Sequence, residues 1–281
     1  MPFPRTTVAG LSLSRLIIGT NYILGYSHKS VAWDNHIKAM NSSVESIASI
    51  IEAFLQHDVD TIMATISVCQ NVIDAIKTAE DRTGKRVYRV DTPAINVDNT
   101  REARQEAMAS FKKCAEAGAD FCLIHHSSCE QLVNRNTRTI DRLPDYTSMM
   151  RECGLIPGLS AHMPEIVMFS DLNEYDVETY IQIYNSIGYL MQVEVETVHS
   201  VIQNAKKPVM TIKSMAAGRQ TPFVGLNFVW NTIRPCDMVT IGCLTPDEVH
   251  EDVEISLAAI ERRPPNVAGR GTINNTFKDI S

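Results

Sequence analysis

The sequence lacks the signatures of several protein classes. No CxxC pair occurs among its seven cysteines, and their odd number argues against a disulfide framework or a zinc ribbon. No apolar run approaches the roughly 18 residues that a membrane-spanning helix requires. No basic block occurs, and 33 Asp and Glu outweigh 26 Lys and Arg, which argues against a nucleic-acid partner. With 44% hydrophobic residues and a net charge of −7, the 281-residue chain is expected to fold.

The first residues also lack the features of a secretory signal. The segment MPFPRTTVAGLSLSRL has arginines but no continuous apolar core. Together with the cysteine pattern, this predicts a cytoplasmic protein with reduced thiols and no membrane partner.

Eight short apolar runs alternate with eight longer stretches of helical spacing. The runs are Arg15–Asn21, Thr61–Ile66, Arg86–Pro93, Ala119–His126, Ile156–Met163, Thr179–Asn185, Pro208–Met215 and Asp237–Leu244. The helical stretches are Ser43–His57, Val68–Thr83, Asn99–Ala117, Leu143–Cys153, Pro164–Ser170, Val193–Ala205, Thr221–Ile233 and Thr245–Arg263. This alternation predicts one α/β domain over residues 1–281, a (β/α)8 TIM barrel. A doubly wound open sheet is the weaker alternative, because no GxGxxG follows the first run.

Three segments fall outside the eight repeats. Within residues 1–14, Thr6–Ser14 has a turn at Ala9-Gly10 and is expected to form a hairpin that plugs the barrel floor. Tyr22–Asn41 is too long for an ordinary strand-to-helix loop, so it either carries function or forms a lid over the barrel mouth. The polar tail, residues 264–281, is expected to have no regular structure.

Polar side chains gather where the apolar runs end, which is where barrels of this type place their active sites. Asp91, His125, His162 and Lys213 are therefore the expected catalytic residues. Asp91, His125 and His162 could also hold Zn²⁺, Mn²⁺ or Fe²⁺, or act as acids and bases without a metal. Strand alternation predicts that only one of His125 and His126 faces the barrel axis. Alternatively, Lys213 has a purely structural role and forms an ion pair with Asp91 or a glutamate.

Further polar and aromatic residues near the expected barrel mouth are predicted to bind substrate. They are Asn21, Tyr26, His28, Trp33, His126, Asn185, Glu194 and Arg219. Arg219 offers a planar fork for a carboxylate or a phosphate, although it could equally be a surface residue. Glu194 opens a helix, where a carboxylate also stabilises the helix dipole.

Five segments resemble the aldo/keto reductase superfamily over nearly the whole barrel, from Leu13 to Ile260. They are LSRLIIGTNYILG, ADFCLIHH, GLIPGLSAH, YIQIYN and VTIGCLTPDEVHEDV. The resemblance implies a (β/α)8 barrel that binds NAD(P). It also implies that His125 is the catalytic histidine, that Ser160 contacts the nicotinamide amide, and that Gln182 forms part of the cofactor floor.

The departures from that family fall on its chemistry. The family's catalytic Asp and Tyr belong in a segment that here reads IMATISVCQN, with Met63 near the Asp position and no Tyr. Asp91 stands where the family has a Lys, and Ala161 where it has an Asn. Asp252 lies near the position of a second missing Asn, where it would repel a 2′-phosphate. The fold is thus expected to be retained and the chemistry replaced, with a divalent metal favoured over NAD(P).

The favoured function is an acid–base or metal-assisted lyase, hydrolase or isomerase of carbohydrate metabolism. Its substrate would be a small polar molecule, sugar-like or a hydroxy acid. Two alternatives stay open: an atypical NAD(P)H-dependent aldo/keto reductase, and a non-catalytic binding subunit. A homo-oligomer formed through the apolar loop Ile187–Met191 or through the tail also stays open.

Overall fold

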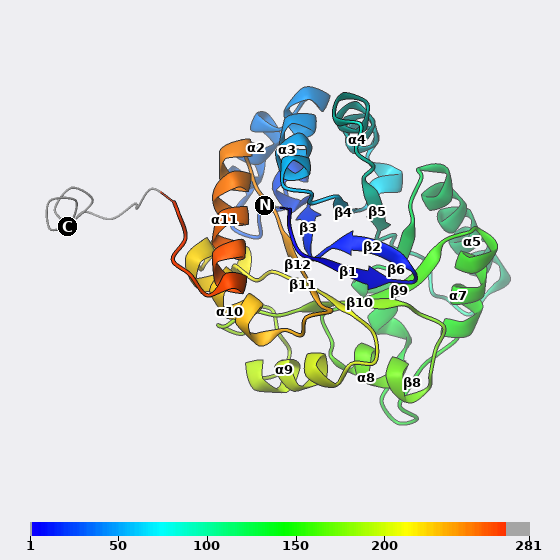
Figure 1. Ribbon diagram of the computed structural model, residues 1–281. Helices are drawn as coiled ribbons and strands as arrows, with labels where there is room; N and C mark the ends of the chain where they lie inside the picture. Colours follow the sequence, from blue (N-terminus) through cyan, green and yellow to red (C-terminus); the bar gives the residue numbers. More distant parts are fainter. Residues whose placement is uncertain (1, 268–281) are drawn as a thin grey trace, which may run out of the picture.

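Eight parallel strands close into a barrel in the computed structural model, which describes residues 2–267 (Figure 1). Around the barrel the order is β10-β11-β12-β3-β4-β5-β6-β9. The strands are β3 (Leu16–Gly19), β4 (Thr61–Ala64), β5 (Tyr88–Asp91), β6 (Phe121–Ile124), β9 (Ile156–Ala161), β10 (Thr179–Ile183), β11 (Val209–Ile212) and β12 (Met238–Ile241). Each lies inside one of the eight apolar runs, so the predicted (β/α)8 barrel is confirmed.

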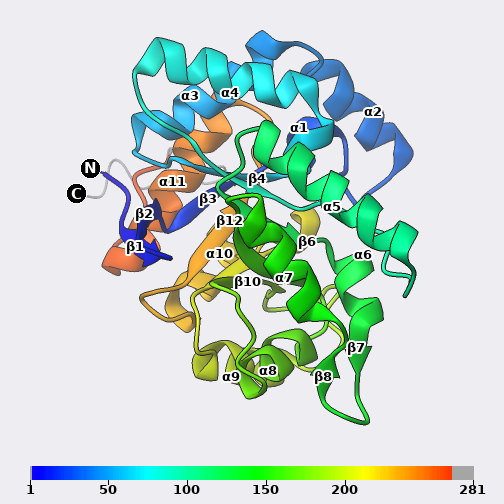
Figure 2. The same ribbon diagram turned by 90° about the vertical axis from the view of Figure 1, so that its right-hand side faces the viewer.

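Helices surround the barrel at the positions that the helical spacing predicted (Figures 1 and 2). They are α3 (Val44–Gln56), α4 (Gln70–Thr83), α5 (Arg101–Glu116), α7 (Leu143–Glu152), α8 (Glu165–Leu172), α9 (Val195–Asn204), α10 (Pro222–Thr232) and α11 (Pro246–Glu261). Hydroxyl N-caps begin several of them. The side chain of Ser43 accepts from the backbone N–H of Ser46 in α3, and that of Thr245 accepts from Glu248 in α11.

The N-terminal segment forms the expected hairpin, β1 (Arg5–Val8) paired antiparallel with β2 (Leu11–Ser14). Ala9 and Gly10 make its turn with positive φ angles of 49° and 80°, as a two-residue hairpin turn requires. Val8 and Leu13 are buried in one cluster with barrel-interior side chains such as Phe121. The hairpin therefore seals the barrel floor with apolar contacts, and Figure 1 shows it lying across that end.

The connection between β3 and α3 is helical rather than irregular. It contains α1 (Asn21–Leu24) and α2 (Val31–Met40), and we call residues 21–41 the lid. Ser30 begins α2 by accepting the backbone N–H of Trp33. Asn41 ends the lid, and its Nδ2 donates to the carbonyl oxygens of Tyr22 and Leu244. The lid is thus tied both to itself and to the segment between β12 and α11.

The connection between β6 and α7 holds further structure that the sequence did not predict. It contains α6 (His126–Cys129), the short 3-10 helix η2 (Glu130–Leu132), and the strands β7 (Val133–Asn134) and β8 (Thr139–Ile140). Figure 2 shows the β7–β8 hairpin at the edge of the molecule, away from the barrel. Because α6 begins directly after β6, this connection carries two histidines over the barrel mouth.

Three other sequence expectations concern the whole chain. No helix within residues 2–267 is both long and apolar enough to cross a membrane. All seven cysteines lie in this range and none forms a disulfide. Residues 264–267 belong to no helix or strand, and the rest of the predicted irregular tail lies outside the described residues.

Candidate active site

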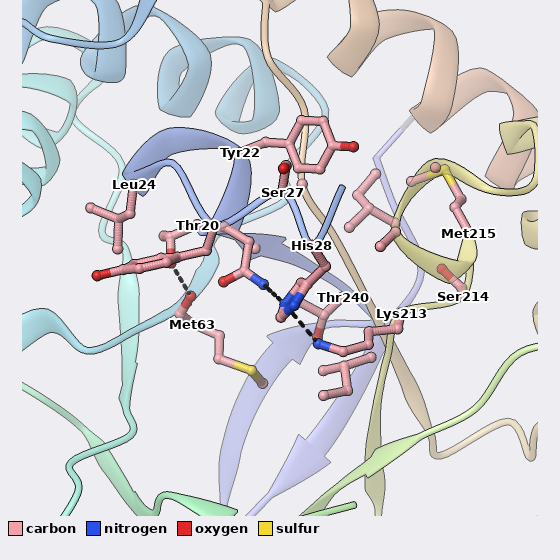
Figure 3. Close-up of a pocket in the computed structure, with 18 of the residues that line it drawn as sticks. Thr20, Tyr22, Leu24, Ser27, His28, Met63, Lys213, Ser214, Met215 and Thr240 are labelled. Atoms are coloured by element: carbon pink, nitrogen blue, oxygen red, sulfur yellow. Dashed lines mark hydrogen bonds between the residues drawn. The ribbon is translucent and has the colours of Figure 1, made fainter. Parts of the chain in front are cut away.

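A cavity of about 850 Å³ opens at the carboxyl ends of the barrel strands, beneath the lid (Figure 3). This is the end at which barrels of this type carry their active sites. Ten of the residues singled out from the sequence line it: Asn21, Tyr26, His28, Trp33, His125, His126, Ser160, His162, Lys213 and Arg219.

Lys213 follows the last residue of β11 and extends into the cavity (Figure 3). Its backbone has a positive φ of 60°, which is uncommon for a residue other than glycine. Its Nζ donates a hydrogen bond to Nε2 of His28, 3.2 Å away. Lys213 makes no salt bridge with any carboxylate of residues 2–267, so the suggested ion pair with Asp91 does not form. Burial lowers the pKa of its ammonium group below the ordinary value.

His28 brings the lid into contact with the barrel. Its Nε2 faces both Lys213 Nζ and, at 3.4 Å, the side-chain amide of Asn21. Both neighbours are donors, so this nitrogen is the acceptor and the ring proton lies on Nδ1. Burial, followed by the nearby Lys213 charge, lowers the pKa of His28. A neutral imidazole therefore lies beside the amine at neutral pH.

Three more histidines that line the cavity lie against one another. The ring centroids of His125 and His126 lie 4.2 Å apart, and those of His126 and His162 lie 3.8 Å apart with nearly parallel planes. Burial lowers the pKa of His125 and of His162 to about 4 in each case. These two rings are neutral at physiological pH and can accept protons.

The prediction that only one of His125 and His126 faces the barrel axis assumed that both residues lie in a strand, and they do not. Both line the cavity. Strand β6 ends at Ile124, so His125 is already the N-cap of α6 and His126 its first residue. Strand alternation no longer applies once the chain has turned into a helix.

Asp91 does not line the cavity, although the sequence placed it among the catalytic and metal-binding residues. It is fully buried, and its two carboxylate oxygens accept the backbone N–H groups of Ile66 (3.1 Å) and Ser67 (2.8 Å). Burial raises its pKa despite these bonds. The carboxylate holds the turn between β4 and α4 and is directed away from the substrate space.

The metal-type ligands that the structure does gather are His126, Glu130 and His162. Glu130 was not singled out from the sequence, although it follows His126 by four residues. Its Oε1 accepts the backbone N–H groups of His162 and Met163. Burial works to raise the pKa of Glu130, but its bonds to His126 and to these backbone groups outweigh that effect and lower it.

Three other predicted site residues lie outside the cavity lining. Asn185 is buried and exchanges hydrogen bonds with the backbone of Tyr189. Glu194 is exposed at the N-cap of α9. Gln182 is buried, and its Nε2 donates to the carbonyl oxygens of His162 and Ile183, both at 3.3 Å. Of the two residues that the family resemblance assigned to a cofactor, only Ser160 borders the cavity.

Cationic and hydroxyl groups line the β11–β12 side of the cavity. The Arg219 guanidinium lies 3.9 Å from the ring centroid of Tyr189, and Lys29 Nζ lies 5.1 Å from that of Trp33. Neither cation forms a salt bridge within residues 2–267. Nearby, Figure 3 shows Ser214 and Thr240, whose buried hydroxyls have no hydrogen-bond partner in the same range. This side of the cavity suits an anionic, oxygen-rich ligand.

The N-terminus of α11, where the family resemblance places the cofactor phosphate, does not fit that group. Thr245 accepts the N–H of Glu248, and Glu248 Oε2 accepts the N–H of Leu244 at 2.8 Å. This capping box uses two of the backbone donors that an anion would need. Glu251 and Asp252 also line this end of the cavity and add negative charge. The residues present oppose the 2′-phosphate of NADP.

No protein-family model and no curated protein sequence matches the chain. Solved structures do. A protein of Pseudomonas aeruginosa titled a putative aldo-keto reductase superposes with a TM-score of 0.65 at 13% identity, covering 91% of this chain and 96% of that one. Aldose reductase from Giardia lamblia superposes with a TM-score of 0.52 at 14% identity, covering 95% of this chain and 90% of that one. A truncated 3-deoxy-D-arabino-heptulosonate 7-phosphate synthase from Thermotoga maritima superposes with a TM-score of 0.52 at 11% identity. The match covers 93% of this chain and 90% of that one.

These likenesses define the class of fold. The chain has a TIM-barrel fold similar to that of these two structures, as its five resembling segments implied. At identities of 11–14% the likeness extends to the fold alone, and the third structure has a different activity in its name. The function must therefore be argued from the residues of the cavity.

Proposed function

We propose that the barrel is an acid–base enzyme, a lyase or isomerase, that acts on a small anionic carbonyl compound through Lys213. The observation that carries this proposal is the environment of its amine. Lys213 Nζ lies in the cavity with a neutral imidazole as its hydrogen-bond acceptor and no carboxylate of residues 2–267 in a salt bridge with it. A purely structural lysine of a barrel core would be paired.

A lysine with a lowered pKa is a nucleophile towards carbonyl groups. His28 is placed to take one proton from the Lys213 ammonium group, because its Nε2 lies 3.2 Å from Nζ. The freed amine attacks the carbonyl carbon, and a proton moves from nitrogen to oxygen to give a carbinolamine. The protonated His28 returns its proton to the carbinolamine hydroxyl, which leaves as water, and a protonated imine remains. The cationic imine then draws electrons from the neighbouring carbon. His125 lines the cavity and is a candidate base that removes a proton either from that carbon or from a hydroxyl group of the substrate.

The substrate class follows from the charges around the amine. Arg219 and Lys29 supply positive charge at the cavity rim, and Ser214 and Thr240 supply hydroxyls without partners among the described residues. A sugar-like or hydroxy-acid carbonyl compound that carries a carboxylate or a phosphate would satisfy both sets of groups.

Borohydride trapping tests the proposal directly. The protein is incubated with a panel of small keto acids and phosphorylated hydroxy-aldehydes, reduced, and weighed by intact-mass spectrometry. Condensation followed by reduction adds the mass of the compound less one oxygen atom. We expect one adduct per chain, mapped to Lys213, and none in Lys213→Met. Lys77→Met, at an exposed lysine of α4, is the matched control and should be labelled like the wild type. Equal labelling of the wild type and Lys213→Met, or no labelling with any compound, would overturn the assignment.

An atypical NAD(P)H-dependent reductase is the second candidate. Ser160 supports it, because this residue borders the cavity as the family resemblance requires. The acidic end of the cavity near α11 and the position of Gln182 count against it. Titration with NADH and NADPH, followed by nicotinamide fluorescence, separates the two candidates. Saturable binding that Ser160→Ala weakens would favour the reductase.

A further inference from the structure

We propose that His126, Glu130 and His162 bind one divalent transition-metal ion at the edge of the cavity. Each residue offers one ligand atom, and these atoms all lie within 4.8 Å of one another. Two imidazoles and one carboxylate with open positions suit Zn²⁺, Fe²⁺ or Mn²⁺. Neither the acid–base proposal nor the aldo/keto-reductase likeness requires this site.

Glu130 is held as a metal-binding carboxylate is usually held. Its Oε1 receives two backbone N–H groups, from His162 at 2.6 Å and from Met163 at 3.1 Å. This leaves Oε2 directed towards Nδ1 of His126, 3.9 Å away. Bonds from a second layer of groups fix the orientation of a ligand and raise its affinity for the metal. The same two bonds also attach Glu130 to the segment that carries His162.

The two imidazoles come from different elements and meet at the cavity. His126 is the first residue of α6, and His162 follows the end of β9. Their rings are stacked at 3.8 Å with an interplanar angle of 20°, so their nitrogen lone pairs lie in nearly parallel planes. Coordination of one ion therefore requires one ring to turn about its Cβ–Cγ bond. Both rings border the cavity, so at least one side of each is free of packed core.

The same position leaves the ion open to a ligand. Because His126 and His162 line the cavity, coordination positions not filled by protein would face the substrate space. There an ion could bind a carbonyl or hydroxyl oxygen of a ligand in the cavity. This catalytic use rests on the function proposed above, whereas binding of the ion does not.

Metal titration tests the site without any need for turnover. The full chain is stripped with a chelator and titrated with Co²⁺, whose visible absorption reports on coordination, and with Zn²⁺ in competition. We expect one ion per chain. Glu130→Gln should weaken binding at least tenfold, while its amide oxygen can still accept the two backbone N–H groups. Glu165→Gln, at a carboxylate on α8 that pairs with Arg135, is the matched control and should bind as the wild type does.

The outcomes of the titration and of the trapping experiment together decide the proposal. Equal affinity in the wild type and in Glu130→Gln and His162→Asn would overturn it, as would no binding at millimolar Co²⁺. Lys213→Met is expected to bind the ion normally while it forms no imine. Metal binding without an imine adduct in the wild type would therefore support the site and contradict only the acid–base function. An imine adduct without metal binding would contradict only the site.

Discussion

Nζ of Lys213 lies 3.2 Å from Nε2 of His28, which joins the end of β11 to the lid. The two groups reach this contact from positions 185 residues apart in the chain. Burial lowers the pKa of both groups, and the Lys213 charge further lowers the pKa of His28. The lid therefore contributes a side chain to the cavity beside Lys213, and under the proposed function this side chain takes part in the chemistry.

Replacing His28 by Asn should slow imine formation at Lys213 without preventing it. Loss of a positioned proton acceptor typically reduces a rate by about a hundredfold or more. The measurement is the rate at which borohydride-trapped adduct accumulates with an active carbonyl compound. An unchanged rate in a folded His28→Asn protein would show that His28 only positions the lid.

Neutralising the rim cations should weaken anionic ligands selectively. Arg219→Gln removes a guanidinium that lies over Tyr189, and we expect about a tenfold rise in KM for an anionic substrate, from a charge-assisted hydrogen bond of about 1.5 kcal/mol. A neutral analogue should be affected little. The comparison is made at two salt concentrations, because screening reduces the contribution of exposed charges. An equal rise for both ligands would rule out a role in charge recognition.

Replacing Asp91 by Asn should destabilise the fold without changing the chemistry. The carboxylate accepts two backbone N–H groups, and the amide of Asn can accept only through one oxygen. One buried donor is left without an acceptor, which costs about 1–3 kcal/mol. Urea unfolding measures this loss. Protein that stays folded should still form the Lys213 adduct, and its failure to do so would return Asp91 to the list of catalytic residues.

The histidine pair between α3 and α11 should make stability depend on pH. Nε2 of His57 lies 2.8 Å from Nδ1 of His250, with Asp58 and Lys85 nearby. Burial, and then the His250 charge, lowers the pKa of His57. The unfolded chain therefore binds this proton more readily. The stability that neutral His57 contributes is complete above a pH of about 6.5, the ordinary pKa of histidine. It is lost as the pH falls from there through the lowered pKa of the folded protein.

The variant His57→Gln should reduce that dependence. Its unfolding free energy should fall less between pH 7 and pH 5 than that of the wild type. The difference in slope corresponds to at most one bound proton, which is about 1.4 kcal/mol per pH unit. His36→Gln, at an exposed histidine of the lid, is the control. An identical pH slope in His57→Gln and the wild type would contradict the prediction.

The barrel could be predicted from the sequence because its strands are buried on both faces. All four residues of β4 and of β6 are buried, so each strand is a continuous apolar run that local pattern detects. The lid helix α2 escaped detection because Ile37 is its one buried residue, so no apolar stripe marks it.

The lining of the candidate site was predicted where it depends on strand ends and missed where it depends on turns. Lys213 and His162 lie directly beyond strands and were found by position alone. Asp91 also ends a strand, but its carboxylate turns to the backbone of a neighbouring connection, a contact that no sequence pattern reveals. Glu130 lies beyond a four-residue helix that has no periodicity to recognise.

The β1–β2 hairpin has a consequence for how ligands enter and leave the cavity. Val8 and Leu13 close one end of the barrel together with interior side chains, and the cavity lies at the other end, beneath the lid. If the proposed enzyme admits its substrate from the lid side, substrate and product use the same opening. Inhibition by the product is then expected to be competitive with the substrate.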